Sequence, residues 1–286
     1  MDDRYRALLA QSFPDLPVRS FAYLGAGEDH IAFAVDETLI VRFNKADDRA
    51  ALAREVRVLR YVATLTELAV PHPAYVAHDA GFLGYPKLPG TPLLAARGAF
   101  ELRRWPDFAR QIGGFLRAIN DAPVAPLAEV LAAEIVSPEE LLTEARASFA
   151  EVRQRIPRPF WASIQAFLDA VPEEHSFTPV LAHNDLGIEH ILVDVAARRV
   201  TGIIDWGDAA LADPAYDLGK LYRDLGPAVL DALLDAYDVG SARAALRRRA
   251  IFYARCGVLE ELAFGLDTGR DEYSTKSLAA LPWLFP

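Results

Sequence analysis

Two short segments of the chain, residues 181–194 and 203–208, gather polar side chains of kinds that carry chemistry. They contain His183, Asp185, His190 and Asp205. Alternating apolar residues predict a strand pair, 191–194 and 200–204, whose turn brings the second segment back beside the first. Such a cluster suits phosphoryl transfer, because that reaction needs a carboxylate to orient the attacking hydroxyl and other groups to hold Mg²⁺ against the phosphates.

The order of these residues resembles the aminoglycoside and macrolide phosphotransferase family, relatives of the protein kinases. Its catalytic loop reads His-x-Asp-x-x-x-x-Asn or His and is followed by Asp-x-Gly, and the resemblance covers nearly the whole chain. It implies that Asp185 accepts or orients the substrate hydroxyl proton and that His183 braces the loop. It also implies that His190 and Asp205 coordinate Mg²⁺. His190 stands where Asn is commoner, which makes the aminoglycoside 2''-phosphotransferase branch the most similar in motif.

The first part of the chain contains candidates for binding the phosphates of ATP or GTP. Strands are predicted over residues 19–35, around a turn that contains Gly25 and Gly27, and glycine there lets the backbone approach a phosphate closely. A simple hairpin turn would explain the same two glycines. In kinases a basic residue on the next strand contacts the phosphates and pairs with a helix glutamate.

Arg42 and Glu55 occupy the places of that pair, on a predicted strand over 38–43 and a predicted helix over 50–64. The family often has Lys at the position of Arg42, so Lys45 is an alternative contact to the phosphates. A surface salt bridge is the structural alternative for the pair.

Residues 84–90 resemble the family's hinge between two lobes. The resemblance implies that the Pro86 carbonyl and the Leu88 amide hydrogen-bond the purine edge, and proline keeps the carbonyl that this needs. Tyr85 would lie behind the purine, which leaves ATP and GTP open as donors.

Hydrophobic periodicity gives the organisation of the whole chain. A mostly strand-built piece precedes a mostly helical one, without repeats. We therefore predict an α+β, protein-kinase-like fold with an N-terminal nucleotide-binding lobe, residues 1–86, and a helical C-terminal lobe, residues 87–286. The longer helices are predicted at 100–120, 137–155, 159–170 and 250–265.

Two aspartates after the catalytic segments have predicted structural roles. Asp213 precedes Pro214 and is expected to cap the N-terminus of a helix. The resemblance implies that Asp217 accepts hydrogen bonds from backbone amides of the catalytic loop.

Carboxylates in the helical piece are candidates for binding a cationic acceptor by charge-assisted hydrogen bonds. They are Asp208, Glu260 and Glu261, with Asp267 and Asp271 just beyond the predicted helix. Only one of the adjacent pair Glu260 and Glu261 can face a cleft squarely, and a solvated helix face is the alternative.

Composition limits the classes of partner and compartment. The 286 residues carry a formal net charge of -10, which argues against a nucleic-acid partner and is compatible with a cationic ligand. Cys256 is the only cysteine, which excludes an intramolecular disulfide. No apolar run is long enough to span a membrane, and the first residues include acids, so we expect a cytoplasmic protein, with a monomer favoured.

These features predict an enzyme that moves the γ-phosphate of ATP or GTP to a hydroxyl of an aminoglycoside antibiotic, with Mg²⁺. Two alternatives stay open at this point. The acceptor could be a macrolide or a small hydroxylated metabolite such as an amino alcohol or a sugar. A protein of another class, a nucleotide-binding pseudokinase or interaction module, could keep the fold without transfer.

Overall fold

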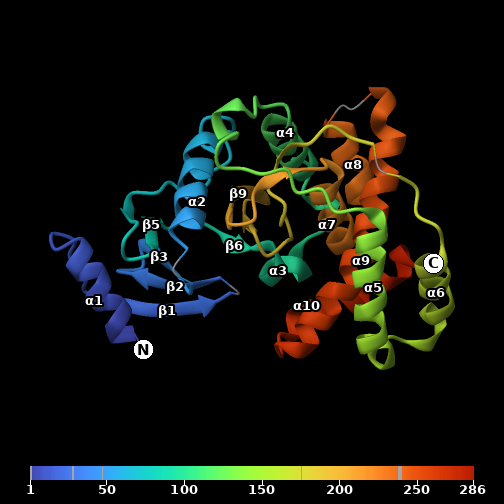
Figure 1. Cartoon of the computed structure of the whole chain (residues 1–286), viewed down its shortest axis with the longest axis horizontal. Coiled ribbons are helices and arrows are strands. Elements are labelled where there is room, and N and C mark those ends of the chain that lie inside the picture. Colours follow the sequence, from blue (N-terminus) through green and yellow to red (C-terminus); the bar gives the residue numbers. More distant parts are fainter. Residues whose placement is uncertain (1, 28, 47, 175, 238–239) are drawn as a thin grey trace.

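A computed structural model of the protein describes residues 2–27, 29–46, 48–174, 176–237 and 240–286. Figure 1 shows the first strands gathered on the left and most of the helices on the right. The strands are β1 Phe21–Ala26, β2 His30–Val35, β3 Leu39–Asn44, β4 Tyr75–Ala77, β5 Phe82–Pro86, β6 Thr91–Pro92, β7 Val180–Ala182, β8 Ile191–Asp194, β9 Arg199–Ile203 and β10 Ala210–Ala212. The α-helices are α1 Asp2–Ser12, α2 Arg49–Val62, α3 Leu93–Ala96, α4 Phe108–Asn120, α5 Pro138–Val152, α6 Trp161–Asp169, α7 Ala215–Leu225, α8 Pro227–Tyr237, α9 Arg243–Asp267 and α10 Asp271–Leu284.

The strands of the first part form an antiparallel five-stranded sheet in the order β1-β2-β3-β5-β4. Its central strand, β3, reads LIVRFN and is buried along almost its whole length, as expected of a strand covered on both faces. One face packs on α1 through aromatic rings that include Phe33, Phe43 and Phe82, all nearly inaccessible to solvent. With the helical second part, this sheet confirms the predicted α+β fold class.

The second part is mainly helical, and its strands are short. The predicted strand pair is confirmed as β8 and β9, which are antiparallel, and β6 joins them at the β8 edge. β7 and β10, which the sequence did not predict separately, form a second small ribbon. The helix predicted over 100–120 begins only at Phe108, because Pro106 interrupts the chain and the residues before it form short 3-10 turns.

Helix α2 belongs to two hydrophobic cores at once. Leu52 and Val56 pack against the five-stranded sheet, whereas Leu59 and Val62 belong to the large core of the helical part. Tyr61 on the same helix donates a hydrogen bond to the carbonyl of Pro123 at 2.7 Å. The helix therefore fixes the sheet to the helical part. Among the described residues, no helix is both long enough and apolar enough to cross a membrane.

We expect Leu59→Ala to lower the free energy of unfolding by about 2–5 kcal/mol, because it empties a buried position in the core that α2 shares with the helical part. Urea titration followed by circular dichroism measures the change. Val171→Ala is the control, since that side chain is 91% exposed and its loss should change stability by less than about 0.5 kcal/mol. A loss below about 1 kcal/mol for Leu59→Ala would contradict the packing of α2.

Candidate active site

A cavity of about 850 Å³ lies between the five-stranded sheet and the helical part. The sheet side contributes the glycine turn and Arg42, and the helical side contributes Asp185 and Asp205. Further described residues of α7, α9 and α10 also line it, among them Lys220, Glu260 and Tyr273. The cavity thus joins the two segments that the sequence singled out.

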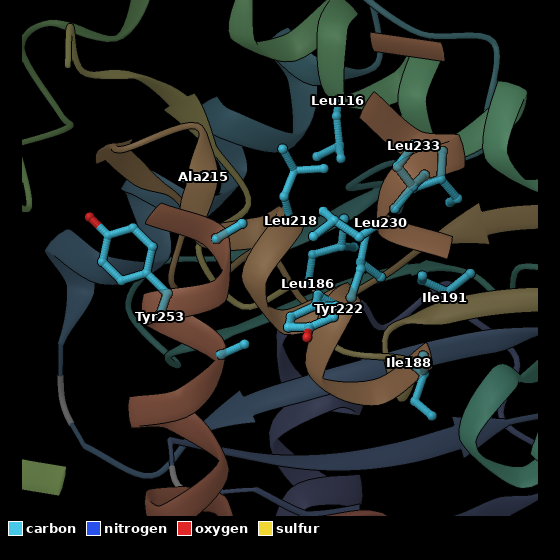
Figure 2. Packing of buried hydrophobic residues seen from close by; sticks show 14 of the residues in the cluster. Leu116, Leu186, Ile188, Ile191, Ala215, Leu218, Tyr222, Leu230, Leu233 and Tyr253 are labelled. Carbon is cyan, nitrogen blue, oxygen red and sulfur yellow. The ribbon is translucent and has the colours of Figure 1, made fainter. Parts of the chain in front are cut away.

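The loop that carries Asp185 connects β7 to β8 and is anchored by its apolar side chains. Leu186 and Ile188 have no exposed surface, and Figure 2 shows them packed among residues of the helical core. His183 is also fully buried. Its Nε2–H donates to the carbonyl of Ile204 at 2.9 Å, and its Nδ1 accepts the amide of Asp185 at 3.3 Å. Because Leu186 and Ile188 point into the core, the loop places Asp185 at the wall of the cavity.

Helix α7 supports this loop from behind. The buried carboxylate of Asp217 accepts the backbone amides of His183 at 2.9 Å and Leu186 at 3.4 Å. Asp213 lies two residues before the helix instead of at its N-cap, a place that Pro214 takes. Its carboxylate accepts the amide of Ala215 and forms an ion pair of 2.6 Å with Arg249.

The Asp185 carboxylate has two charged neighbours. Lys220 Nζ donates to Oδ1 at 2.7 Å, and His190 Nδ1 lies 3.4 Å from Oδ2. The same Nδ1 is closer to the Asp185 carbonyl oxygen, at 2.7 Å. Burial alone would raise the pKa of Asp185, but Lys220 and His190 outweigh it and lower this pKa. Asp185 is therefore a fixed anion at neutral pH.

Arg42 lies at the centre of a second charged group. Its Nη1 donates to Glu55 and its Nη2 donates to Asp205, each at 2.7 Å. Nη2 also lies 3.0 Å from His30 Nδ1. Because a guanidinium can only donate, this ring nitrogen must accept the hydrogen bond. Burial and the Arg42 charge lower the pKa of His30 to about 4, so the imidazole stays neutral. Glu55 points inward from α2 towards Arg42 and is buried.

The donor atoms near Asp205 fit Mg²⁺ in part. Asp205 supplies the carboxylate oxygens that this ion prefers, and its Oδ2 lies 3.6 Å from His190 Nε2, so both can face one ion. Burial lowers the pKa of His190, but the carboxylates of Asp185 and Asp205 outweigh it and raise this pKa, so a proton competes for the imidazole. Within the described ranges, no three His, Cys, Asp or Glu side chains form a metal-binding group. Phosphate oxygens and water would have to complete the shell.

Not every predicted nucleotide contact reaches this cavity. Gly25 and Gly27 line it, whereas Glu28 of the same turn lies outside the described residues. Lys45 donates to the Gly27 carbonyl at 2.6 Å instead of lining the cavity, which favours Arg42 as the basic group there. The hinge residues Pro86 and Leu88 are not among the described lining residues; Pro86 ends β5 beside Leu39.

The predicted acceptor carboxylates lie in different environments. Glu260 is exposed and lines the cavity, as does Asp208. Glu261 is buried and already ion-paired, with Arg223 at 2.7 Å and Lys276 at 2.8 Å. It therefore belongs to the floor of the cavity and is not a free carboxylate for an acceptor, which corrects the sequence interpretation.

The positions of two further carboxylates also differ from expectation. Asp267 is the last residue of α9, and Asp271 is the first residue of α10. Neither is among the described lining residues of the cavity.

The cavity carries an excess of negative charge. Partial burial and the neighbouring carboxylates of Asp185 and Asp205 raise the pKa of Asp208 to about 6. Crowded carboxylates of this kind disfavour each other's ionisation, and a bound cation relieves the repulsion.

Comparison with known proteins assigns the family. Residues 21–252 match the model of the phosphotransferase enzyme family. The chain belongs to this family. It is therefore a small-molecule O-phosphotransferase, which confirms both the resemblance and the predicted class of enzyme.

Two curated proteins illustrate how this phosphotransferase relates to others. The uncharacterized protein YcbJ of Bacillus subtilis is 26% identical over 221 residues, which cover 73% of this chain and 71% of YcbJ. The viomycin phosphotransferase of Streptomyces vinaceus is 34% identical over 113 residues, 35% of this chain and 38% of that protein.

Solved structures show that the phosphotransferase fold extends over the whole chain. The GDP and kanamycin complex of the aminoglycoside phosphotransferase APH(2'')-IIIa superimposes with a TM-score of 0.79 at 22% identity, covering 98% of this chain and 97% of that one. Macrolide 2'-phosphotransferase type I gives a TM-score of 0.67 at 24% identity, covering 98% and 96%.

Several residues of this candidate active site were missed by sequence reasoning. His30 contacts Arg42 across the sheet, and only its place at the start of a strand after the glycine turn pointed to it. Lys220 pairs with Asp185 from 35 residues away, and its spacing of three from Asp217 on one helix was the available signal. Glu189 of the loop forms a 2.8 Å ion pair with the buried Lys276 of α10, which no local pattern indicated.

We expect the stability of this phosphotransferase to fall as the pH drops from 6.5 towards 4 because of His183. Burial and the nearby His190 lower the pKa of His183 from 6.5 to about 4. In that window the unfolded chain binds more protons than the folded one, so His183 contributes a loss of about 3 kcal/mol on acidification.

Thermal or urea unfolding at several pH values tests this contribution. His183→Gln should flatten the pH dependence, whereas His72→Gln, at an exposed position, should keep the wild-type slope. An unchanged slope in His183→Gln would show that the buried imidazole is not responsible.

Proposed function

We propose that this enzyme transfers the γ-phosphoryl group of ATP or GTP to a hydroxyl of a cationic antibiotic of the aminoglycoside class, with Mg²⁺. The observation that carries the proposal is the single cavity in which Asp185, Asp205 and Arg42 meet acidic residues of α9 and α10. Donor, metal and acceptor groups can thus occupy one connected space.

The proposed reaction uses each group at a stated place. The acceptor hydroxyl oxygen bonds to the γ-phosphorus while the bond from phosphorus to the β–γ bridging oxygen breaks, and the nucleoside diphosphate leaves with that electron pair. Asp185 orients the hydroxyl and takes its proton. Arg42 faces the phosphates, and Mg²⁺, held by Asp205 and His190, would offset their charge.

Charge favours a cationic acceptor. Among the described residues that line the cavity, eight are Asp or Glu and four are Arg or Lys. Glu260 is exposed and lines the cavity, where an ammonium group of an acceptor can reach it. GDP and kanamycin occupy the similar structure of the aminoglycoside phosphotransferase, which supports the proposed ligand classes.

Aromatic side chains favour a second acceptor class, the macrolides. Tyr216, Tyr253, Phe264 and Tyr273 also line the cavity, and Phe264 is 38% exposed. A less polar acceptor can pack on these rings. The similarity in fold to a macrolide phosphotransferase is in keeping with this alternative.

The first experiment is an acceptor screen. The purified protein is incubated with Mg²⁺, with either ATP or GTP, and with panels of aminoglycosides, macrolides, amino alcohols and sugars. The masses of the products are then measured by mass spectrometry. The proposal expects a gain of one phosphoryl group on an aminoglycoside. A gain on a macrolide or metabolite alone would move the assignment to that class, and nucleotide binding without any transfer would favour a pseudokinase.

We expect Asp185→Asn to lower kcat by about 10²- to 10⁴-fold, because the amide cannot take the hydroxyl proton. Nucleotide affinity, measured by calorimetry, should change by less than about threefold. Asp194→Asn, at the end of β8 on the neighbouring hairpin, is the control for loss of one carboxylate. Wild-type turnover in Asp185→Asn would remove this residue from its proposed role.

We expect Asp205→Asn to raise the Mg²⁺ concentration required for half-maximal turnover at least about tenfold, because a ligand oxygen loses its charge. Turnover measured over a Mg²⁺ titration tests this. A sample treated with a chelator gives the turnover in the absence of Mg²⁺. An unchanged Mg²⁺ dependence would assign the metal to other groups.

A further inference from the structure

Helix α7 presents two charged side chains to the loop that carries Asp185. Asp217 holds the loop backbone by accepting the amides of His183 and Leu186. Lys220, three residues later and so on the same side of the helix, reaches the Asp185 carboxylate itself. The contact of Asp217 fixes the loop backbone, and the contact of Lys220 fixes the Asp185 side chain.

The contact between Lys220 and Asp185 is specific to one oxygen. Nζ lies 2.7 Å from Oδ1. The His190 ring nitrogen is nearer to the Asp185 carbonyl oxygen than to Oδ2, so Oδ2 is the oxygen left to receive an acceptor hydroxyl. A carboxylate free to rotate about its last bond would exchange the two oxygens, whereas a short ion pair to one of them keeps the other in place.

The lysine is itself held in position. Its side chain is 19% exposed, compared with 31% for Asp185, and its Nζ lies 5.4 Å from the centre of the Tyr216 ring, one helical turn earlier. Such a cation close to an aromatic ring gains further electrostatic stabilisation. Lys220 also lines the cavity, beside the carboxylate that it contacts.

We propose that Lys220 is a positioning residue for phosphoryl transfer, which holds the Asp185 carboxylate with Oδ2 towards the acceptor hydroxyl. This inference rests on the proposed role of Asp185. Lys220 takes no part in bond making or breaking, and it acts through the placement of its partner. Because Asp217 already anchors the loop backbone, the lysine is not needed to hold the loop on α7.

The test compares Lys220→Met, which removes the charge, with Lys220→Arg, which keeps it. We expect Lys220→Met to lower kcat about 10- to 100-fold through misplacement of Asp185, while KM for the nucleotide changes less than about threefold. Lys220→Arg should restore most of the kcat that Lys220→Met loses, although a planar guanidinium does not reproduce the lysine contact fully.

Arg249→Met is the matched control for structural damage. Arg249 also supports α7 by a short ion pair to an aspartate, Asp213, and is buried to a similar degree, at 13% exposed. We expect this variant to lower the melting temperature and to leave kcat within about threefold. For each variant, the loss of kcat is compared with the decrease in melting temperature. If Lys220→Met and Arg249→Met show the same loss of kcat for the same decrease in melting temperature, Lys220 is structural and the proposal is wrong.

A double-mutant cycle decides whether Lys220 acts through Asp185. In an Asp185→Asn background, Lys220→Met should cost less than about twofold in kcat, because the group that it positions is already disabled. A loss as large as in the wild-type background would overturn the proposal.

The same cycle is measured on nucleotide hydrolysis by water, without an acceptor. Hydrolysis without transfer to any antibiotic would contradict the proposed acceptor, and the Lys220 comparison would then be decided on hydrolysis. The two proposals can therefore fail separately.

Discussion

The arrangement of the site depends on one buried cation, Arg42. Arg42 is only 6% exposed, and such a charge is tolerated inside a protein only when ionised partners surround it at hydrogen-bonding distance. One partner, Glu55, comes from α2, and the other, Asp205, follows β9 in the helical part. Losing either partner would leave one carboxylate to satisfy a buried guanidinium that now has two, which is destabilising. The interactions of Arg42 therefore hold the sheet against the segment 203–208, which contains Asp205. The cavity lies beside this contact.

A second constraint acts on the other side of the cavity, where helix α7 serves two environments. Leu218 and Tyr222 pack into the hydrophobic core with Leu186 of the loop that carries Asp185, as Figure 2 shows, while Asp217 and Lys220 face the polar part of the same loop. The apolar contacts fix how far the loop lies from the helix. The polar contacts then fix its backbone through Asp217 and its carboxylate through Lys220.

Sequence patterns predicted the features that depend on neighbouring residues. The hairpin of β8 and β9 and the pair of Arg42 with Glu55 followed from periodicity and from the family resemblance. The partner of Glu261 depends on how distant helices pack, for which a single sequence contains no periodic signal, and the spacing of Lys220 from Asp217 indicates a shared helix face but not the contact of Lys220 with Asp185. Glu261 shows the cost: an acidic residue on an amphipathic helix suggests a ligand, and only the packing of α10 reveals that Lys276 already neutralises it.

Charge balance in the cavity links the donor and the acceptor. Each of the described cations that line it already pairs with a carboxylate: Arg42 with Asp205, Lys220 with Asp185, Arg223 with Glu261 and Arg270 with Glu272. The lining carboxylates still outnumber the lining cations by eight to four, and under the proposed function this excess would suit a cationic acceptor and oppose a free nucleotide. A divalent cation beside the phosphates would reduce that repulsion, and the phosphates would compete with Asp205 for Arg42. Asp205, if released from Arg42, would have the charge and the oxygen atoms to hold such a cation, which would couple entry of the proposed donor to completion of the proposed metal site.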